Sequence, residues 1–287
     1  MVASRNRRDL LLETLPRHLA LPERPRVVLV DDASTDGTTG AVAEALPGVT
    51  VIRLERPLGG AARNAGLRAV DAPYVALCDD DSWWTPGALR RAADLLDRHP
   101  RLAVVNGHVL AGADAHDDPL CEEMAGSPLP GEDDQPGHPL LSFIACAVVM
   151  RRSAVLEQGA FTERLGIGGE EQLLGWDLAG AGWWQSYVPD IVARHVPPPN
   201  DGRPERRARE LRNVLWITWL RRPAGTAMAR TVRQILRAPR DRDTASGVVQ
   251  ALAGLPWVLR ERRPSPPHVE AMRQALERHQ PRQPLDR

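Results

Sequence analysis

Lysine is absent from this sequence, cysteine is scarce, and long apolar runs are missing. Cys78, Cys121 and Cys146 are too few and too scattered for a disulfide framework or a zinc site. Cys78 and Cys146 lie in apolar runs, which predicts small buried side chains. No apolar run approaches the roughly 18–20 residues of a membrane span, and residues 1–8 do not resemble a signal peptide. The chain is therefore expected to be cytoplasmic.

The composition is that of a folded protein whose charges are segregated. Hydrophobic residues make up 43% and charged residues 26% of 287 residues, which excludes a wholly disordered or collagen-like chain. The length fits one large domain with appendages, or two domains. All 37 basic residues are arginines, balanced by 37 acidic residues. Residues 1–202 hold 18 Arg against 29 acids, a net charge of −11, whereas residues 203–287 hold 19 against 8, a net charge of +11. The sequence thus divides into an acidic part, 1–202, and a basic part, 203–287.

The first hundred residues alternate strand and helix patterns. Compact apolar or β-branched runs predict buried strands at 26–30, 49–54 and 74–78. Amphipathic or capped segments predict helices at 9–21, 38–46, 60–70 and 86–98. Strands and helices that alternate through short connections predict an α/β domain with a mostly parallel sheet flanked by helices.

The remaining sequence contains a long loop, a second α/β part and a helical tail. Residues 112–139 are rich in Asp, Glu, Pro and Gly and lack periodicity, which is typical of a functional or mobile loop. Beyond the loop, we expect strands at 143–150 and 187–196 and a helix at 170–182. Helical patterns at 205–221, 224–238, 245–260 and 267–279 predict an Arg-rich helical extension.

Acidic clusters follow two of the predicted strands. Asp31 and Asp32 end the first, and Asp79–Asp81 follow the third. Because ligands bind outside the carboxyl ends of parallel strands, these side chains are expected at one functional edge. Two carboxylates two residues apart can bind one divalent cation, which in turn bridges phosphate oxygens. A solvated acidic turn is the alternative, but the buried strand before Asp79 and the Trp83-Trp84-Thr85-Pro86 run after Asp81 favour a functional site.

Five short segments occur in a recognisable order. They are Ser4-Arg5-Asn6-Arg7, VDDASTDGT at 30–38, LGGAARNAG at 58–66, Asp79-Asp80-Asp81 followed by Pro86, and Gly168-Gly169-Glu170-Glu171. Together they resemble family 2 glycosyltransferases, which have the GT-A fold and use nucleotide sugars. The resemblance covers roughly residues 1–200. It implies a Rossmann-like GT-A catalytic domain over 1–202, with a donor and metal half at about 1–110 and an acceptor and base half at about 140–202.

The resemblance also implies roles in donor binding. The expected donor-binding residues are Ser4, Asn6, Arg7, Asp31, Asp32, Arg63, Asn64, Asp79 and Asp80. Asp32 corresponds to the residue that accepts hydrogen bonds from the nucleotide base, while Asp31 alternatively orients the turn. Arg63 and Asn64 begin a helix beside the phosphate region, although a surface or ion-pair role fits Arg63 equally well.

The same resemblance assigns a metal site and a base. Asp79, Asp81 and His195 are the expected ligands of Mg²⁺ or Mn²⁺, with direct coordination favoured for Asp81; a structural role is the alternative for His195. Glu171 stands where the family usually has an Asp base, which takes the proton from the acceptor hydroxyl. Its neighbour Glu170 is the alternative base. A pair of acids stabilised by the helix dipole is the structural alternative for both.

Two features depart from the family pattern. Asp177 stands where many members carry a basic residue. The first strand of the family is about five residues long, but here only four residues precede the Arg5-Asn6-Arg7 loop. We therefore expect either that the true start lies upstream or that this first strand is frayed.

The basic tail leaves its partner open. Residues 211–238 pair Leu, Trp and Ile with Arg at helical spacing, which suits an anionic membrane surface. Packing against the catalytic domain is the alternative. The implied partners are a nucleotide-sugar donor and an unidentified acceptor, namely a glycan, a lipid-linked or a small molecule. A nucleotidyltransferase is disfavoured because no Gly-rich loop with a basic residue follows the first strand, and the acidic front half argues against a nucleic-acid-binding protein.

Overall fold

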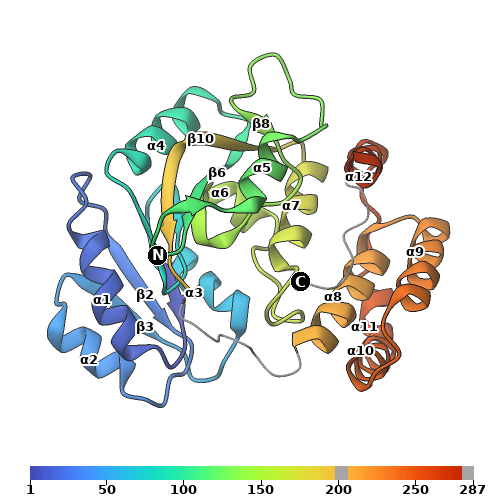
Figure 1. Cartoon of the computed structure of the whole chain (residues 1–287), viewed down its shortest axis with the longest axis horizontal. Helices are drawn as coiled ribbons and strands as arrows, with labels where there is room; N and C mark the ends of the chain where they lie inside the picture. The colour runs from blue at the N-terminus through green and yellow to red at the C-terminus, as the bar shows by residue number, and fades with distance from the viewer. Residues whose placement is uncertain (198–205, 280–287) are drawn as a thin grey trace.

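The computed structural model describes residues 1–197 and 206–279. Strands occupy the centre, helices cover them on both sides, and a cluster of C-terminal helices lies beside α7 (Figure 1). This is the α/β arrangement expected from the sequence. The expected boundary between residues 202 and 203 lies outside the described residues.

A small parallel sheet forms the N-terminal part of the molecule. Its strands, in spatial order, are β1 (Val2–Ser4), β2 (Val27–Asp31) and β3 (Val49–Arg53). All five residues of β2 are buried, as expected for a β-branched central strand covered on both faces. The carboxyl end of β2 therefore delivers Asp31 and Asp32 to the edge of the sheet.

The larger sheet is mixed rather than mostly parallel. Its main path, in spatial order, is β4 (Tyr74–Leu77), β9 (Val148–Arg151), β6 (Leu102–Ala111), β10 (Trp184–His195) and β5 (Ser82–Trp84). Only β6 and β10 pair in parallel on this path, whereas β9 and β5 run antiparallel to their neighbours. A parallel bridge between Val2 and Cys78 joins the two sheets. The position of β9 between β4 and β6 depends on long-range pairing that alternation along the sequence does not reveal.

Helices flank the sheets where their apolar faces can be buried. Those of the first part are α1 (Arg8–Leu19), α2 (Thr38–Ala45), the 3₁₀ helix η1 (Gly59–Ala62), α3 (Arg63–Ala69) and α4 (Ala88–Arg98). Those of the second part are α5 (Pro119–Ala125), the 3₁₀ helix η2 (Ala145–Ala147), α6 (Arg152–Glu157) and α7 (Glu170–Gly180). Two hydrophobic cores result, one including α1 and α4, the other α3, α6 and α7. All three cysteines are free and buried, as expected for Cys78 and Cys146.

Several segments differ from the sequence-based expectation. The strand expected at 143–150 begins only at Val148, after the 3₁₀ helix η2, and β5 was not predicted. The helix expected at 245–260 is divided into two helices, Arg242–Ala253 and Leu255–Arg260. Strand β6 was not predicted, although it pairs with β9, β10 and the short strand β7 (His116–Asp117). The segment 112–139 is not structureless, because it contains β7, α5 and the short strand β8 (His138–Pro139). The Asn106–Gly107 pair inside β6 is typical of a turn, and Asn106 is buried with its amide bonded to backbone groups.

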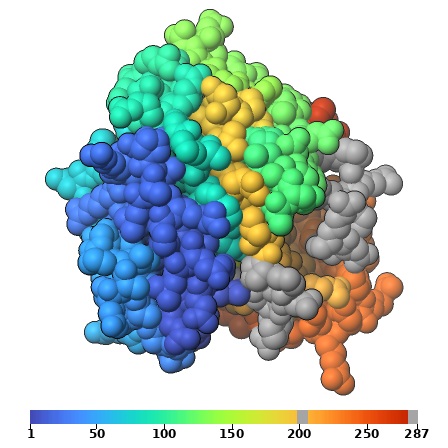
Figure 2. Space-filling view, turned by 60° about the vertical axis from the view of Figure 1, so that its left-hand side comes forward, coloured from blue at the N-terminus to red at the C-terminus, as the bar shows by residue number. Residues whose placement is uncertain are grey.

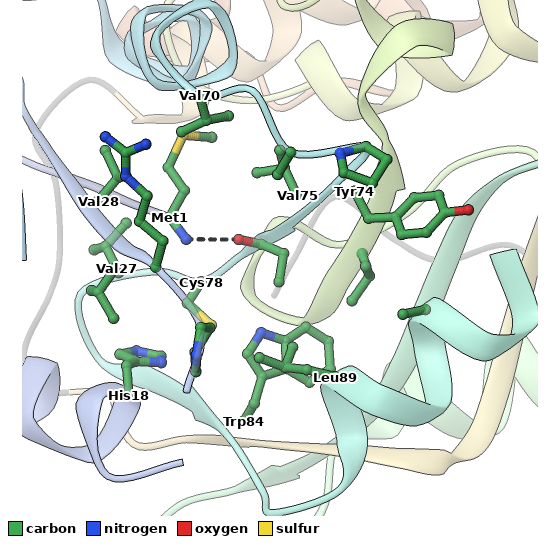
Figure 3. A pocket seen from close by; sticks show the side chains of 18 of the residues that line it. Met1, His18, Val27, Val28, Val70, Tyr74, Val75, Cys78, Trp84 and Leu89 are labelled. Atoms are coloured by element: carbon green, nitrogen blue, oxygen red, sulfur yellow. Dashed lines mark hydrogen bonds between the residues drawn. The ribbon is translucent and has the colours of Figure 1, made fainter. Parts of the chain in front are cut away.

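The first strand is short but ordered, so the expectation that it is frayed is wrong. Val2 and Ser4 are buried, and β1 pairs with β2 from Val2 to Ser4. The Met1 ammonium donates to the carbonyl of Ala76 at 2.8 Å (Figure 3). An apolar cavity of about 520 Å³ lies next to Met1, between Val27–Val28 of β2 and Tyr74–Ala76 of β4. Cys78, Trp84 and His18 complete its walls.

The C-terminal helices share a core with the second part of the chain. They are α8 (Arg206–Arg221), α9 (Ala224–Arg237), α10 (Arg242–Ala253), α11 (Leu255–Arg260) and α12 (Pro267–His279). Leu215 and Trp216 of α8 are buried in one cluster with Leu173 and Trp176 of α7. Helix α8 therefore packs against the catalytic part of the chain, which was the alternative to membrane binding. The face of α8 that carries Trp216 is not available to a membrane. Within residues 1–197 and 206–279, no helix is long and apolar enough to cross a membrane.

Candidate active site

Asp31 holds the turn that follows β2. Its carboxylate accepts hydrogen bonds from the Ser34 N–H at 2.8 Å and from the Thr39 hydroxyl, and Arg53 lies 3.1 Å away. Burial alone would raise the pKa of Asp31, but the hydrogen bonds from Ser34 and Thr39 hold it below its ordinary value. Because the side chain is fully buried, this geometry supports the turn-orienting role.

Asp32 anchors the Gly-rich segment. Its two carboxylate oxygens accept from the backbone N–H groups of Leu58 at 2.6 Å and Gly59 at 2.9 Å. Each carboxylate oxygen has a second lone pair, so Asp32 can still accept from a ligand at the same edge. The contact with the nucleotide base stays a prediction.

The loop after β1 joins this edge. The Asn6 side-chain oxygen accepts from the Thr35 N–H at 2.8 Å, and Ser4 Oγ donates to Asp80 Oδ2 at 2.5 Å. Burial raises the pKa of Asp80, opposed by the hydrogen bond from Ser4. The positive charge of Arg7 also acts to lower the pKa of Asp80. Asp80 is thus engaged with the N-terminal loop, while Asp79 and Asp81 flank it.

Asp81 and His195 meet through strand pairing. His195 lies opposite Ser82 in the antiparallel β10–β5 register, which brings its Nε2 to 3.3 Å from Asp81 Oδ1. The Asp81 carboxylate raises the pKa of His195, with burial opposing. Oδ1 of Asp81 is buried and, apart from this contact with His195, has no hydrogen-bond partner in the part of the chain that the structure describes.

This pair fits a divalent cation, but it does not form a complete protein cage. Over the described ranges, no group of three or more His, Cys, Asp or Glu side chains is placed to hold a metal ion. Asp79, the third expected ligand, instead pairs with Arg63 at 3.2 Å. Mg²⁺ is commonly bound by one or two carboxylates together with substrate phosphates and waters. A buried carboxylate oxygen whose neighbour is an imidazole nitrogen suits that kind of site.

Arg63 connects the expected metal region to the expected base. Its guanidinium lies 3.2 Å from Asp79, 3.5 Å from Glu170 and 3.6 Å from Glu171. Burial alone would lower the pKa of Arg63, but the three carboxylates raise it. Arg63 therefore forms ion pairs, which was one of the roles that the sequence left open. These ion pairs lie within the candidate site and not on a remote surface.

The two adjacent glutamates occupy different environments. The Glu170 side chain is 2% exposed and lies against Gly60, whereas the Glu171 side chain is 20% exposed. Burial and the neighbouring Glu170 carboxylate raise the pKa of Glu171 to about 7, while Arg63 opposes this effect. Glu171 therefore has both the access and the basicity that a proton acceptor needs near neutral pH.

Asn64 does not reach this edge. Its side-chain amide donates to the Phe161 carbonyl at 2.7 Å and accepts from the Phe161 N–H at 3.0 Å. Because Asn64 is buried and both ends of its amide are engaged, the donor-binding role expected for it finds no support here. It instead fastens α3 to the segment before α7.

The sequence analysis missed the contribution of α8. Asn213 is buried and donates to the carbonyls of Leu165, Ile167 and Gly168, in the loop that leads to Glu170. Arg221 binds Asp177 through two contacts of 2.5 and 2.9 Å. This pairing accounts for an acid at position 177, because the positively charged partner of Asp177 is Arg221 of the helical tail. Only the spacing of helical patterns was visible in the sequence, not which side chains face α7.

Comparison with known proteins identifies the family. A model of "Glycosyl transferase family 2" matches residues 1–158, more than half of the chain. The chain belongs to glycosyltransferase family 2. It is thus an enzyme that transfers glycosyl groups, and the earlier resemblance is confirmed.

Characterised relatives of this glycosyltransferase include enzymes with different substrates. N-acetylglucosaminyl-diphospho-decaprenol L-rhamnosyltransferase of Mycobacterium tuberculosis is 28% identical over 216 residues, covering 63% of this chain and 70% of that protein. Pre-mycofactocin glycosyltransferase of the same species is 29% identical, covering 59% of this chain and 37% of that protein.

Solved structures confirm the GT-A fold. Mannosyltransferase PcManGT from Pyrobaculum calidifontis, in complex with GDP-Man and Mn²⁺, has a TM-score of 0.59 and 21% identity, covering 98% of this chain and 75% of that chain. Staphylococcus aureus TarS in complex with UDP-GlcNAc has a TM-score of 0.61 and 18% identity, covering 94% of this chain and 82% of that chain. At these identities the likeness shows the fold alone.

Proposed function

We propose that this glycosyltransferase moves a sugar from a nucleotide-diphosphate donor to an acceptor hydroxyl, with inversion at the anomeric carbon and with help from Mg²⁺ or Mn²⁺. The observation that carries the proposal is Arg63, which contacts both Asp79 and Glu171. It places the acidic end of β4 beside a carboxylate with a pKa of about 7. A donor diphosphate and an attacking hydroxyl can then meet at one edge.

The proposed step needs one base and one leaving group. Glu171 accepts the proton of the acceptor hydroxyl while the hydroxyl oxygen of the acceptor forms a bond to the anomeric carbon. The bond from that carbon to the diphosphate oxygen breaks, and its electron pair leaves with the nucleoside diphosphate. Attack opposite the leaving group inverts the configuration. Arg63 keeps Glu171 and Asp79 in fixed relative positions during this exchange.

The acidic edge itself argues for a cation. Asp79, Asp80 and Asp81 would repel a diphosphate, and Arg63 is already shared among three carboxylates. Asp81 and His195 are the residues that would hold the ion, with Asp79 beside them. When bound, a divalent cation would offset the charge of the phosphate oxygens and of the leaving group. Solved GT-A neighbours contain Mn²⁺, which supports this part of the proposal.

The relatives suggest the chemical class of the substrates. Structural neighbours are complexed with GDP-Man and UDP-GlcNAc, which favours a nucleotide-sugar donor. The rhamnosyltransferase relative is named for a polyprenyl diphosphate sugar, so we propose a lipid-linked acceptor, in preference to a free glycan or a small molecule. A cytoplasmic location with peripheral membrane contact belongs to this proposal.

The test is a donor panel. GDP-mannose, UDP-N-acetylglucosamine and a nucleotide-activated L-rhamnose are offered with Mn²⁺, with Mg²⁺ or with a chelator, and binding and hydrolysis are measured. At least one donor should bind in a cation-dependent manner, and Asp81→Ala should weaken that binding by tenfold or more. Leu120→Ala, at an exposed position on α5, is the matched control and should bind as the parent does.

Two results would count against the proposal. If a folded sample gives no cation-dependent response to any donor, the metal-assisted mechanism is wrong. Where transfer occurs, the anomeric configuration of the product is read by NMR, and retention would exclude the inverting step with Glu171 as base.

A further inference from the structure

One side of helix α9 is apolar and exposed. Met228, Val232, Ile235 and Leu236 are 40 to 70% exposed. They follow one another at helical spacing, so they form a single stripe along the helix. Within α9, only Ala227 is buried. An exposed apolar stripe of this kind marks an interaction site more often than a solvated face.

Specific contacts fix α9 with this stripe outward. Trp219 of α8 donates its indole N–H to the Thr231 hydroxyl at 2.9 Å. Arg230 pairs with Glu277 of α12 at 2.5 Å. The inner face of the helix is thus tied to two neighbours. The apolar stripe therefore faces outward in a helix that is packed against its neighbours.

The charge around the stripe has one sign. Residues 223–240 contain four arginines and no acidic residue. Arg230 is paired, whereas Arg233, Arg237 and Arg240 are exposed, and no ion pair is found for them among the residues described. A second copy of this helix would bring like charges together. An anionic surface with an apolar layer beneath it complements both features.

We propose that α9 is a membrane-docking helix that lies in the interface of an anionic lipid bilayer. Met228, Val232, Ile235 and Leu236 enter the acyl boundary, and Arg233, Arg237 and Arg240 contact lipid phosphates. This docking does not depend on the identity of the donor or the acceptor. It would hold the catalytic part at a bilayer, where lipid-linked hydroxyls are found.

The sequence suggested a membrane-binding surface over residues 211–238, and the structure restricts it to a shorter segment. Residues 211–221 belong to the buried part of α8, so the docking face begins only after Pro223. Orange atoms, which belong to the part of the chain before α12, project at the lower right of Figure 2. Nucleic acid would also attract the arginines, but it would leave the apolar stripe exposed to water, and the net charge of residues 1–202 is −11.

Co-sedimentation with lipid vesicles tests the proposal in the full chain. Vesicles contain phosphatidylcholine alone or with about one third phosphatidylglycerol. The parent should bind the anionic vesicles at least tenfold more tightly than the neutral ones. Val232→Gln with Leu236→Gln should reduce binding by tenfold or more, because the stripe is interrupted. Arg233→Gln with Arg237→Gln should reduce it on the order of tenfold and weaken its dependence on salt.

The matched control removes two exposed leucines elsewhere, by Leu19→Gln with Leu120→Gln. It should bind anionic vesicles as the parent does, and circular dichroism should show all variants folded. Equal losses in control and α9 variants, or no binding of the parent to anionic vesicles, would overturn the proposal. So would tight binding to double-stranded DNA that persists in the Val232→Gln, Leu236→Gln variant, since a nucleic-acid surface would then explain the arginines.

Discussion

Asn213, on the C-terminal helix α8, donates its side-chain amide to the backbone carbonyl of Gly168 at 2.6 Å. Gly168 and Gly169 have φ angles of 99° and 91°, which favour glycine, and α7 with its two glutamates starts directly after them. From the other side, the Gly60 N–H donates to the Gly166 carbonyl at 2.7 Å. The loop before Glu171 is therefore held between the Gly-rich segment and the helical tail. The tail thus contributes to the position of this loop through Asn213.

We expect Asn213→Ala to misplace Glu171. The substitution removes the Asn213 amide from three loop carbonyls, of which that of Leu165 keeps a hydrogen bond from Arg212. The loss costs about 1–3 kcal/mol of stability. It should lower kcat by on the order of tenfold to a hundredfold, because small shifts of a base are costly, and leave the donor Kd nearly unchanged. Steady-state kinetics with donor titrations measure both. Gln234→Ala, which removes an amide from the same tail, should change neither; an unchanged kcat in Asn213→Ala would refute the positioning role.

The adjacent glutamates can be separated by one matched pair of variants. Glu171→Gln should lower transfer by a factor of about 10² to 10⁴, since a proton acceptor is lost, while donor binding is retained. Glu170→Gln keeps the shape of a buried side chain that lies against Gly60, so its loss of transfer should be much smaller. Single-turnover transfer and donor binding are measured for both. If Glu170→Gln proves the more damaging of the two, the assignment of the base is reversed.

Activity and stability should respond to pH in opposite directions. Glu171 must lose its proton to act as a base, so kcat should rise with pH through about 7 and then level off. Stability should fall between about pH 4.5 and 7, because in that range the unfolded Glu171 is ionised while the folded one retains its proton. Rate profiles and denaturant titrations across pH 4–9 check both trends. In Glu171→Gln the fall in stability should be smaller; an identical fall would assign it to other groups.

Gly60 is expected to tolerate no side chain. A methyl group there would overlap the Glu170 carboxylate, so Gly60→Ala should destabilise the protein by about 1–3 kcal/mol and lower transfer. The matched control is Gly40→Ala in α2, where the methyl group meets nothing within 4 Å. That variant should be unchanged or up to about 1 kcal/mol more stable, because alanine favours helix. Chemical denaturation compares the two, and equal stabilities would contradict the predicted overlap.

The cavity beside Met1 predicts that the first strand can be lengthened. Burial lowers the pKa of the Met1 ammonium, which reflects the cost of a charge in an apolar place. Adding Thr-Val-Val-Val before Met1 would replace the ammonium with a peptide N–H. Because Val2 lies opposite Leu29, the added residues would continue the strand opposite Val27 and Arg26. The melting temperature should rise by about 2–4 °C for each kcal/mol gained.

An extension of Gly-Ser-Gly-Asp before Met1 is the control, since it also removes the ammonium but has little strand propensity. If the two extensions give the same melting temperature, strand continuation into the cavity is excluded.

Short windows of sequence were enough for several elements, including the two strands that lead to the acidic clusters. The apolar run ending at Asp31 and the run before Asp79 gave β2 and β4 within about one residue, and the helix expected at 267–279 is α12. These assignments succeed because periodicity, capping and turn residues act over a few neighbouring positions. The family motifs added the order of the carboxylates, but not the distances between them.

Tertiary structure decided which of these side chains meet. The contact of His195 with Asp81 depends on the antiparallel β10–β5 register, and the pairing of Asp177 with Arg221 depends on α8 packing against α7. It also decided that the apolar side chains of α8 are buried while those of α9 face outward. Such contacts join residues far apart in the chain through pairing and packing, whose free energies depend on the whole fold. Sequence alone therefore determined the family, and the three-dimensional structure determined how the tail holds the loop before Glu171 and which apolar side chains of α9 face outward.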